Sequence, residues 1–259
     1  MPSREVLTMG AEVRQRNEAI HAETDTETDT ETDIDADPGP ETRPVRAPDE
    51  PLPPARIRSS VSIPLQLGPD RFVPAEVVSF HGLADQGEHV AVVFGDALKQ
   101  DCPLVRVHSE CLTGDVLGSA RCDCGPQLRE SMDLLGAGGG LLLYLRQEGR
   151  GIGLYNKLEA YLLQDVGMDT FAANRALNFG DDLRDYRVAA QMLAALGTHQ
   201  VDMLTNNPAK AAGLRERGIV VRRRLSTGVH VTQANRGYLM AKIDHAGHEI
   251  NVDDVRSAK

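Results

Sequence analysis

Three cysteines of this chain lie in the stretch SECLTGDVLGSARCDCG. Ten residues separate Cys111 from Cys122, and one separates Cys122 from Cys124. A Cys-x-Cys pair can chelate one ion. A third thiolate from a nearby loop then leaves one coordination position for water, as in catalytic rather than structural zinc sites. Zinc lowers the pKa of such water and supplies hydroxide near neutral pH. The spacing favours one Zn2+ per subunit. On spacing alone, a second interpretation stays open, in which the three cysteines are buried or reactive thiols that bind no metal.

The fourth cysteine, Cys102, precedes Pro103 at the predicted entry to a strand. In a reducing compartment, thiols clustered in one short stretch favour metal binding or catalysis over disulfides. We expect Cys102 to be a small apolar filler and not a fourth metal ligand.

Basic residues flank the first of these thiols and recur later in the chain. Arg106 and His108 alternate with two valines, so they share one face of a strand and can meet an anion. Residues 149–151 (GRG) lead into a helix predicted to begin near Leu154. Small residues before a helix N-terminus leave backbone amides free for a phosphate, and an arginine adds charge. This turn is not a P-loop, because no Gly-Lys-Ser/Thr follows it.

Two further polar clusters fit either a functional or a structural interpretation. Residues 179–186 (FGDDLRDY) are charged side chains at a predicted helix start, where aspartate is an ordinary cap. Residues 205–210 (TNNPAK) follow a predicted strand and open a helix, so they are either an anion site or a capped turn.

Strands and helices must hold these polar groups in place. Apolar patterning predicts strands over 57–67, 71–80, 89–94 and 103–108, and the run LLLYL predicts a buried strand over 141–145. Helices are predicted over 125–135, 154–166, 185–196 and 208–217, with strands over 201–204 and 219–224. The glycine-rich run 136–140 is expected to stop the first helix and form a flexible link. We therefore predict an α+β (mixed α/β) fold, with a β-rich N-terminal layer followed by alternating helices and strands around the zinc site.

Composition limits the class of protein. The chain has 259 residues, 41% of them hydrophobic and 25% charged, as in a globular protein of one or two domains. It has no apolar run near the roughly 20 residues that span a bilayer and no apolar secretory signal, so we expect a cytoplasmic protein without a membrane partner. Residues 1–50 carry −9 of the net charge of −10, through fourteen acidic and five basic side chains. The nearly neutral remainder argues against a nucleic-acid partner.

The first 55 residues differ in composition from the rest. Residues 23–33 read ETDTETDTETD, and a proline-rich stretch follows. Such a segment buries too little apolar area to offset its ordering entropy, so residues 1–55 are predicted to be a disordered tail. A solubilising role and a binding or regulatory role are both compatible with this composition. Residues 56–259 are predicted to be the folded, catalytic domain.

Six motifs together resemble GTP cyclohydrolase II. They are RVHSECLTGD (106–115), RCDCGPQL (121–128), RQEGRGIGLYNK (146–157), DT…AN (169–174), DDLRDY (181–186) and LTNNPAK (204–210), in that family's order and approximate spacing. The resemblance covers roughly residues 57–250. It implies a zinc enzyme, a homodimer as in the family, that hydrolyses GTP to formate, pyrophosphate and 2,5-diamino-6-ribosylamino-4(3H)-pyrimidinone 5′-phosphate. This reaction is the first committed step of riboflavin biosynthesis.

The resemblance also implies roles for individual residues. The three clustered cysteines would be the zinc ligands, with Mg2+ on the GTP phosphates. Asp182 would be the proton acceptor, Arg184 the nucleophile at the α-phosphate, and Tyr161 the residue that positions the attacking water. The GTP-binding set would be Arg106, Val107, His108, Ser109, Glu110, Gln127, Glu148, Gly149, Arg150, Thr170, Thr205 and Lys210.

Elementary chemistry refines some of these roles. Guanine selection needs an acceptor for N1–H and the amino group, and Glu148 is the expected carboxylate. A guanidinium stays protonated and is a poor nucleophile, so phosphate stabilisation suits Arg184 better than a covalent role. The presence of Tyr161 predicts that deformylation goes to completion. Asn178 stands where the family often has glycine, and asparagine tolerates a left-handed backbone.

Two alternative functions remain at this stage. One is a paralogue that feeds the ring-opened product into a specialised metabolite, which the sequence does not separate from the main pathway. The other is a GTP-binding protein without catalysis. Retention of the three clustered cysteines together with Asp182 and Arg184 argues against this second alternative.

Overall fold

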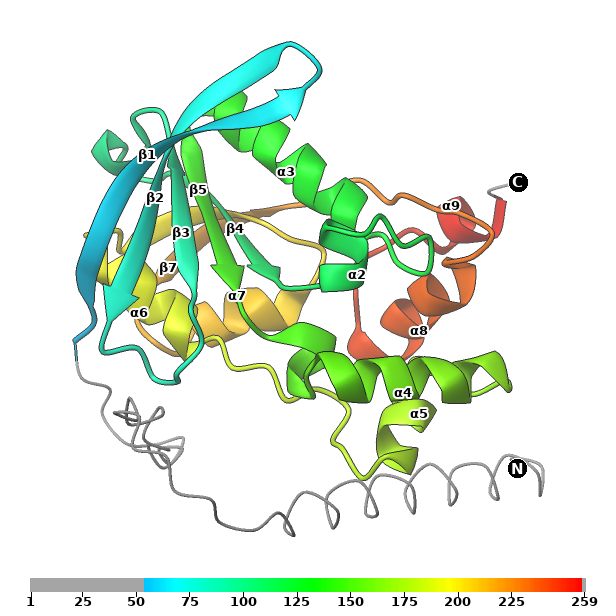
Figure 1. Ribbon diagram of the computed structural model, residues 1–259. Coiled ribbons are helices and arrows are strands. Elements are labelled where there is room, and N and C mark those ends of the chain that lie inside the picture. Colours follow the sequence, from blue (N-terminus) through cyan, green and yellow to red (C-terminus); the bar gives the residue numbers. More distant parts are fainter. Residues whose placement is uncertain (1–53, 258–259) are drawn as a thin grey trace, which may run out of the picture.

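Seven strands form one mixed sheet in the computed structural model, which describes residues 54–257 (Figure 1). The predicted tail, apart from its last two residues, lies outside the described part of the chain, and the predicted domain boundary stays a prediction. The strands are β1 (Arg56–Gly68), β2 (Arg71–His81), β3 (Val90–Phe94), β4 (Leu104–Ser109), β5 (Gly140–Leu145), β6 (Gln200–Leu204) and β7 (Val220–Leu225).

The strand order is β1-β2-β3-β5-β4-β6-β7, and it divides the sheet into two halves. β1, β2, β3 and β5 pair in antiparallel fashion, whereas β5, β4, β6 and β7 run parallel. β4 therefore lies between β5 and β6, with Val107 opposite Leu143 of β5. The predicted α+β fold is confirmed, and its β-rich N-terminal layer continues the same sheet as the later parallel strands.

Helices cover both faces of the sheet. On one face, α3 (Cys124–Gly138) packs Leu135 against Phe94 and Leu142. On the other face, α6 (Arg187–Ala195) and α7 (Pro208–Arg215) pack against the larger core cluster. Because side chains alternate along a strand, the LLLYL run of β5 serves both cores: residues 141, 143 and 145 belong to the larger cluster and residue 142 to the smaller. The prediction of a strand buried on both faces is thus confirmed.

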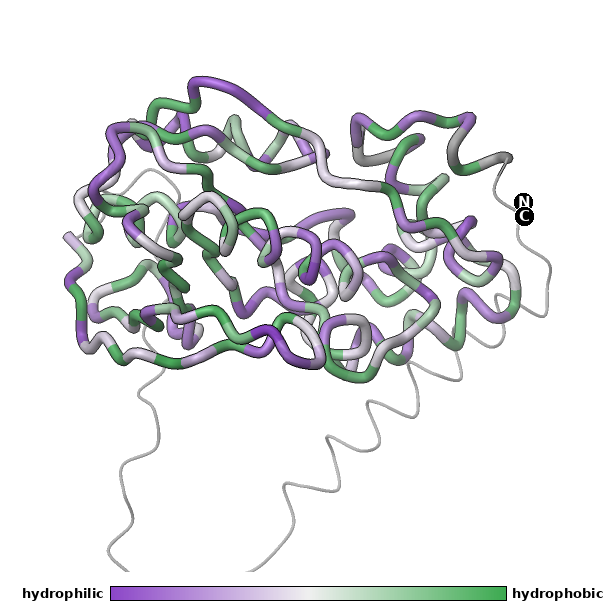
Figure 2. Tube along the Cα trace, turned by 90° about the horizontal axis from the view of Figure 1, so that it is seen from above, coloured by the Kyte–Doolittle hydropathy of each residue, from purple (hydrophilic) through white to green (hydrophobic). Residues whose placement is uncertain are grey.

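The remaining helices gather beside the sheet and not over its faces (Figure 1). They are α2 (Leu112–Asp115), α4 (Leu154–Asp165), α5 (Thr170–Ala176), α8 (Arg236–Ala246) and α9 (Val252–Ser257), with short 3-10 turns at Ala97–Lys99 (η1) and Glu148–Gly151 (η2). Apolar and polar residues are interleaved along most of the trace in Figure 2. Within residues 54–257, no helix is long and apolar enough to cross a membrane.

Two predicted boundaries were wrong. α3 continues through residues 136–138, and only Gly139, with φ of 72°, separates it from β5, so the expected flexible link does not exist. The helix predicted from residue 185 begins at Arg187, because Asp185 accepts a hydrogen bond from the Arg187 amide and stays outside the helix.

Four helices in the described part of the chain were not predicted. The first, α2, is a single turn of 4 residues, too short for a periodic pattern. α5 had a visible signal, since its N-cap Asp169 accepts hydrogen bonds from the amides of Phe171 and Ala172. α8 and α9 had none of comparable strength, because polar and apolar residues of α8 do not segregate at a helical period.

Candidate active site

The polar motifs meet at the carboxyl ends of three adjacent parallel strands. β4 ends at Ser109 and leads to the first thiol, β5 ends at Leu145 and leads to the glycine-rich turn, and β6 ends at Leu204 and leads to residues 205–210. Because parallel strands end on one edge of a sheet, segments distant in sequence converge there. This edge is where open α/β sheets usually bind their ligands.

A single cavity opens at this edge, with about 970 Å3 of empty space including its mouth. Most of the predicted site residues line it: Arg106, His108, Ser109, Glu110, Cys111, Cys124, Gln127, Glu148, Gly149, Arg150, Tyr161, Thr170, Arg184, Thr205 and Lys210. Val107, Cys122 and Asp182 do not, although the Val107 carbonyl accepts a hydrogen bond from Lys210 Nζ at 2.8 Å.

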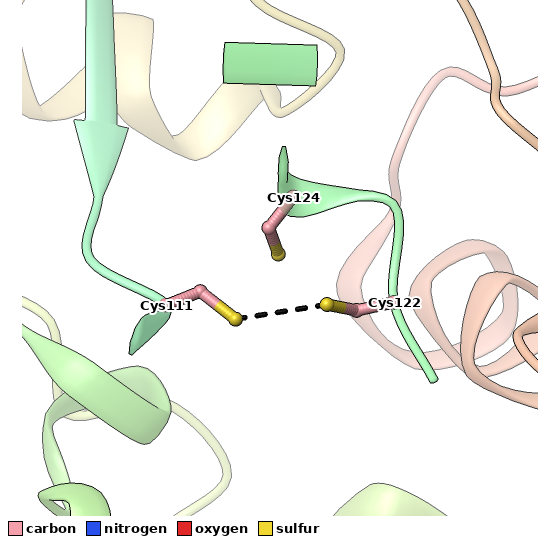
Figure 3. A group of neighbouring side chains, drawn as sticks. All are labelled: Cys111, Cys122 and Cys124. Carbon is pink, nitrogen blue, oxygen red and sulfur yellow. Dashed lines mark hydrogen bonds between the residues drawn. The ribbon is translucent and has the colours of Figure 1, made fainter. Parts of the chain in front are cut away.

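The three clustered thiols point toward one another (Figure 3). Their sulfur atoms all lie within 4.8 Å of each other, and Cys111 Sγ is 3.6 Å from Cys122 Sγ. Tetrahedral Zn–S bonds of about 2.3 Å place two sulfurs nearly 4 Å apart, so this spacing fits a zinc ion. Cys111 follows β4, Cys124 begins α3, and Cys122 lies in the loop before that helix. The thiol donor set, three soft ligands with no fourth cysteine nearby, fits zinc with one open position.

Close backbone contact brings the two cysteine loops together. A Cβ on Gly114 would lie 2.6 Å from Cys122 Sγ and 3.1 Å from Cys111 Sγ, and one on Gly125 would lie 2.2 Å from the Gly114 carbonyl oxygen. Only glycine fits at either position. Sequence analysis missed these two glycines as site residues, although they stand inside the cysteine motifs.

Asp115 fixes the first loop. Its carboxylate accepts hydrogen bonds from the Cys111 amide at 3.0 Å and from the Tyr144 hydroxyl at 2.9 Å, and it contacts His108 Nε2 at 3.0 Å. The buried His108 imidazole is therefore tied to the loop, and burial lowers its pKa. His108 lines the cavity while it holds the position of the first thiol.

The pKa values of the three thiols differ. Hydrogen bonds from Cys122 and Cys124 hold the pKa of Cys111 far below its ordinary value, and the nearby Lys157 ammonium adds to this. The bond to an ionised Cys111 raises the pKa of Cys122 to about 11 and also raises that of Cys124. A second and third thiolate need more positive charge than the protein provides, which is the charge that a divalent cation brings.

Cys102 stands apart from this cluster, as predicted. It is half-buried, and its sulfur lies 3.6 Å from Asp202 Oδ1 at the opposite end of β4. Its prediction as an apolar filler was incomplete, because the thiol has a polar partner.

Glu148 lines the cavity and already accepts three hydrogen bonds from the protein, so its predicted role in reading guanine stays a prediction. Its Oε2 accepts from the Leu112 amide at 2.6 Å, and its Oε1 accepts from the Gly149 amide at 2.9 Å and from Lys157 Nζ at 2.7 Å. The buried carboxylate therefore ties the glycine-rich turn and α4 to the loop that follows Cys111. Lys157 was missed by sequence analysis, although it closes the RQEGRGIGLYNK motif.

Three cations face the cavity without a carboxylate partner among residues 54–257: Arg106 and Lys210 are buried, and Arg150 is half-buried. Arg106 bonds the Leu204 carbonyl and Gln127 Oε1, and its Nε has no partner there. Arg150 stacks over the Phe171 ring at 4.2 Å, with Nη1 unpartnered. Burial and neighbouring cations lower the pKa of Lys210 well below its ordinary value. Buried unpaired charge is costly, so these three cations indicate an anionic ligand.

The glycine-rich turn that holds Arg150 has an unusual backbone conformation. Gly149 and Arg150 both take the left-handed region, with φ of 61° and 63°. The Arg150 carbonyl accepts from the Leu183 amide at 2.9 Å, which docks the segment holding Asp182 and Arg184 onto this turn.

The turn before α4 lines the cavity through Gly149, Arg150 and Ile152, and the predicted binding of phosphate by its amides stays a prediction. The side of that helix, through Lys157, Ala160, Tyr161 and Gln164, lines the cavity, and its N-terminal residue Leu154 does not. These four positions recur at helical spacing, so one stripe of α4 faces the cavity.

Asp182 and Arg184 form an ion pair beside the cavity, with Arg184 Nε donating to Asp182 Oδ1 at 2.8 Å. Burial opposes the charge of both groups, but the pair outweighs it: the pKa of Asp182 is lowered and that of Arg184 is raised. Asp182 is thus a carboxylate and Arg184 a cation. Tyr161 lies on the opposite wall, where burial raises its pKa. The left-handed backbone expected of Asn178 is confirmed, with φ of 63°.

The amino-acid sequence of this chain is similar to those of proteins with known names. The chain matches the family described as GTP cyclohydrolase II over residues 60–226. It is 54% identical to the GTP cyclohydrolase-2 of Aliivibrio salmonicida over 192 residues, which cover 74% of this chain and 96% of that protein. It is 51% identical to the GTP cyclohydrolase-2 of Vibrio cholerae over 199 residues, or 76% of this chain and 100% of that protein.

Two further comparisons are more limited. The riboflavin biosynthesis protein RibBA of Bacillus cytotoxicus is 48% identical over 186 residues, covering 70% of this chain and 47% of that protein. A solved two-domain 3,4-dihydroxy-2-butanone 4-phosphate synthase from A. baumannii aligns at 16% identity over 58% of this chain and 34% of that chain, with a TM-score of 0.31, which is too low to argue from. The family match and the relatives identical at about half of their positions establish that this chain belongs to the GTP cyclohydrolase II family.

Proposed function

We propose that this chain is a zinc-dependent enzyme of riboflavin biosynthesis. In the proposed reaction it hydrolyses GTP to formate, pyrophosphate and 2,5-diamino-6-ribosylamino-4(3H)-pyrimidinone 5′-phosphate. The observation that carries the proposal is one cavity lined by two thiols of the three-cysteine cluster, Cys111 and Cys124, and by three cations without carboxylate partners among residues 54–257. A metal-ligating end and an anion-binding end in one cavity suit a nucleoside triphosphate whose base is the reacting group.

Cys111, Cys122 and Cys124 would hold the zinc, as the fit of the sulfur spacing supports. The ion supplies Lewis acidity and makes hydroxide available at neutral pH for attack on an electrophilic ring carbon. The chain positions the three sulfurs through close glycine contacts and through Asp115, so the geometry is set before substrate arrives. Tyr161, on the α4 side of the same cavity, would orient the attacking water.

Arg106, Arg150 and Lys210 would bind the triphosphate, and Mg2+ would accompany the phosphates. Buried cations aimed at a cavity stabilise charge that develops on a leaving pyrophosphate. Thr170 and Thr205 line the same space. The Thr170 hydroxyl can donate a hydrogen bond to the substrate, whereas the Thr205 hydroxyl donates to the Asn207 carbonyl at 3.2 Å.

Glu148 already accepts three hydrogen bonds, so a second acceptor beside it would help to read guanine. Gln147 lines the cavity, and its buried Oε1 has no partner among residues 54–257. We assign the acceptor for guanine N1–H to this atom. Glu148 then acts as a positioning residue for Lys157 and the Cys111 loop.

Asp182 would accept a proton and Arg184 would stabilise negative charge at the α-phosphate. An arginine whose pKa is raised further by an ion pair stays protonated, so it has no lone pair for covalent attack. The ion pair also fixes the side chain of Arg184 at the edge of the cavity.

The direct test is incubation of the purified protein with GTP, Zn2+ and Mg2+, followed by mass analysis of products. We expect formate, pyrophosphate and the diaminopyrimidine. Absence of all three from zinc-loaded protein would refute the enzymatic function and favour a GTP-binding protein. A formylated product would identify an enzyme that stops after ring opening.

A matched pair of variants tests the metal assignment. Cys122→Ser is expected to lose zinc and activity, whereas Cys102→Ser, outside the cluster, is expected to keep both. Retention of zinc and turnover by the first variant contradicts the ligand assignment.

We further propose that the protein is a homodimer. β1 is an edge strand of 13 residues that exposes Ile57, Val61 and Ile63, and long exposed edges of this kind are usually covered. Light scattering coupled to size exclusion is expected to give twice the chain mass; the monomer mass refutes the proposal.

A further inference from the structure

The C-terminal part of the chain supplies residues to the cavity that lie outside the matched family region. That region ends at residue 226, yet Tyr238, Lys242 and His248 line the cavity. Tyr238 and Lys242 come from α8, and His248 follows its end. None of them stands in the six motifs that carry the family resemblance.

At one end of the cavity, α8 contacts the loop that bears two of the thiols. The Tyr238 hydroxyl lies 3.9 Å from Cys124 Sγ. Lys242 Nζ pairs with Asp123 Oδ1 at 2.6 Å, and both groups are buried. Asp123 stands between Cys122 and Cys124, so Lys242 holds the residue that joins two thiols.

This contact extends into the phosphate-binding wall. The other Asp123 oxygen accepts from Gln127 Nε2 at 2.6 Å, and Gln127 Oε1 accepts from Arg106 Nη2 at 3.3 Å. Lys242, Asp123, Gln127 and Arg106 thus form one buried chain of hydrogen bonds from α8 to β4. Such networks fix side-chain positions more firmly than isolated pairs.

His248 also lines the cavity, where it lies near four cations. Burial, together with the charges of Lys242, Lys210, Arg184 and Arg150, lowers the pKa of His248 to about 2. The imidazole is therefore neutral, and it keeps one N–H that can donate to an oxyanion. Its neighbours are the groups to which the triphosphate is assigned above.

The segment is packed firmly enough to serve as a wall. α8 ends at Gly247, whose left-handed backbone, with φ of 58°, reverses the chain before His248. The next amide, of Glu249, donates to the Asn206 carbonyl at 2.9 Å, and the Glu249 carboxylate pairs with Arg224 at 2.7 Å. A separate core of Leu239, Ile250 and Val255 closes behind it.

We propose that residues 236–250 form a third wall of the substrate site, in which His248 is a binding residue for the phosphate chain and Lys242 is a positioning residue for the metal-holding loop. The identity of the substrate rests on the proposed function, whereas the two contacts do not. The wall predicts that zinc and pyrophosphate affinities depend on residues beyond the matched family region.

The experiment uses full-length protein and two probes that require no turnover. Zn2+ affinity is measured by competition with a chromophoric chelator, and inorganic pyrophosphate affinity by calorimetry on zinc-loaded protein. The variants are His248→Ala, His248→Gln, Lys242→Met and Lys242→Arg. Asp244→Asn is the control, because Asp244 lies on the same helix and is exposed.

We expect His248→Ala to weaken pyrophosphate binding about tenfold or more, as for loss of a hydrogen bond to a charged group, and to leave Zn2+ affinity within about twofold. His248→Gln keeps a donor and should recover part of the loss. Lys242→Met should weaken Zn2+ binding about tenfold, the loss typical of groups that orient metal ligands, and Lys242→Arg should restore most of it.

The proposal is overturned if His248→Ala binds pyrophosphate as tightly as the Asp244→Asn control does. It is also overturned if Lys242→Met binds Zn2+ as tightly as that control. Thermal unfolding identifies a variant that fails to fold. His248→Phe or Lys242→Gln, which also removes the imidazole N–H or the ammonium, then replaces that variant under the same criterion. A protein that shows both effects but turns over no GTP keeps the wall and refutes only the proposed function.

Discussion

The ammonium nitrogen of Lys157 lies 3.2 Å from the sulfur of Cys111. The same nitrogen donates to Glu148 Oε1 at 2.7 Å and to the Thr113 hydroxyl at 3.0 Å. One cation therefore stabilises a thiolate and neutralises a buried carboxylate. This position makes Lys157 the link between the loop that follows Cys111 and α4.

Lys157→Met is expected to weaken Zn2+ binding about tenfold and to lower the free energy of unfolding by about 3 kcal/mol, because Glu148 is left buried and unpaired. Chelator competition and urea unfolding measure the two effects. The double variant Glu148→Gln/Lys157→Met should regain much of the stability but not the zinc affinity. Equal zinc affinity in wild type and Lys157→Met contradicts the role of the lysine.

Gly114→Ala should abolish metal binding, because the new methyl group would lie 2.6 Å from Cys122 Sγ and displace a ligand. Gly138→Ala, at the open C-terminal end of α3, is the control: nothing lies within 4 Å of its Cβ, and it should be neutral or stabilising by up to about 1 kcal/mol. Zinc content after dialysis measures the difference. Normal zinc content in Gly114→Ala would show that the loops are free to move apart.

Lys210→Met should weaken GTP binding and make the folded protein more stable. A buried ammonium with a lowered pKa makes the folded state costly at neutral pH, and methionine removes this cost. We expect an unfolding free energy higher by about 1 kcal/mol and a GTP KM at least about tenfold higher, the loss of one charge-assisted hydrogen bond. A variant that is less stable with unchanged KM would refute the assignment of Lys210 to the phosphates.

Arg184 should form no covalent adduct. Protein quenched with acid during GTP turnover is expected to keep its unmodified mass, because a guanidinium paired with Asp182 stays protonated. Arg184→Lys keeps the positive charge and should lose about tenfold or more in kcat, while Arg184→Met should lose more. Detection of a guanylyl adduct on wild type that is missing from Arg184→Lys would establish the covalent role.

His248 should make the protein sensitive to acid. Its pKa is about 2 when folded, against 6.5 for an ordinary histidine, so below pH 6.5 the unfolded chain takes up a proton that the folded protein does not. Stability therefore falls as pH drops from 6.5, by at most about 1.4 kcal/mol per pH unit from this group. Unfolding of His248→Asn from about pH 7 to about pH 4 should show a shallower slope than wild type; parallel slopes would exclude this cause.

The regular elements were largely predictable from local patterning. β5 is an apolar run of strand length, and β4 alternates valines with Arg106 and His108. α7 is marked by Pro208 at its first turn and an asparagine cap. Such signals are local, so one sequence suffices. α8 lacked a signal because its polar residues Lys242 and Tyr238 point inward to the cavity, which removes the usual separation of polar and apolar faces.

The candidate site was predictable as a set of residues but not as a geometry. Motif resemblance identified Glu148 without revealing that Leu112, Gly149 and Lys157 occupy its oxygens. Those partners come from three segments, and only the tertiary structure brings them together. The same holds for His248, which no motif marks and which reaches the cavity because the backbone reverses at the end of α8.

The position of β4 has a consequence for how the protein folds. β4 carries the first thiol on its carboxyl end, yet it pairs with β6, almost a hundred residues further along the chain. Long-range pairing of this kind is slow, because the intervening chain must close before contacts form. A nascent chain that has completed only β1, β2 and β3 lacks β5 and β6, the two strands that pair with β4. Acquisition of the metal is therefore expected to be a late event, and its rate would report completion of the central sheet.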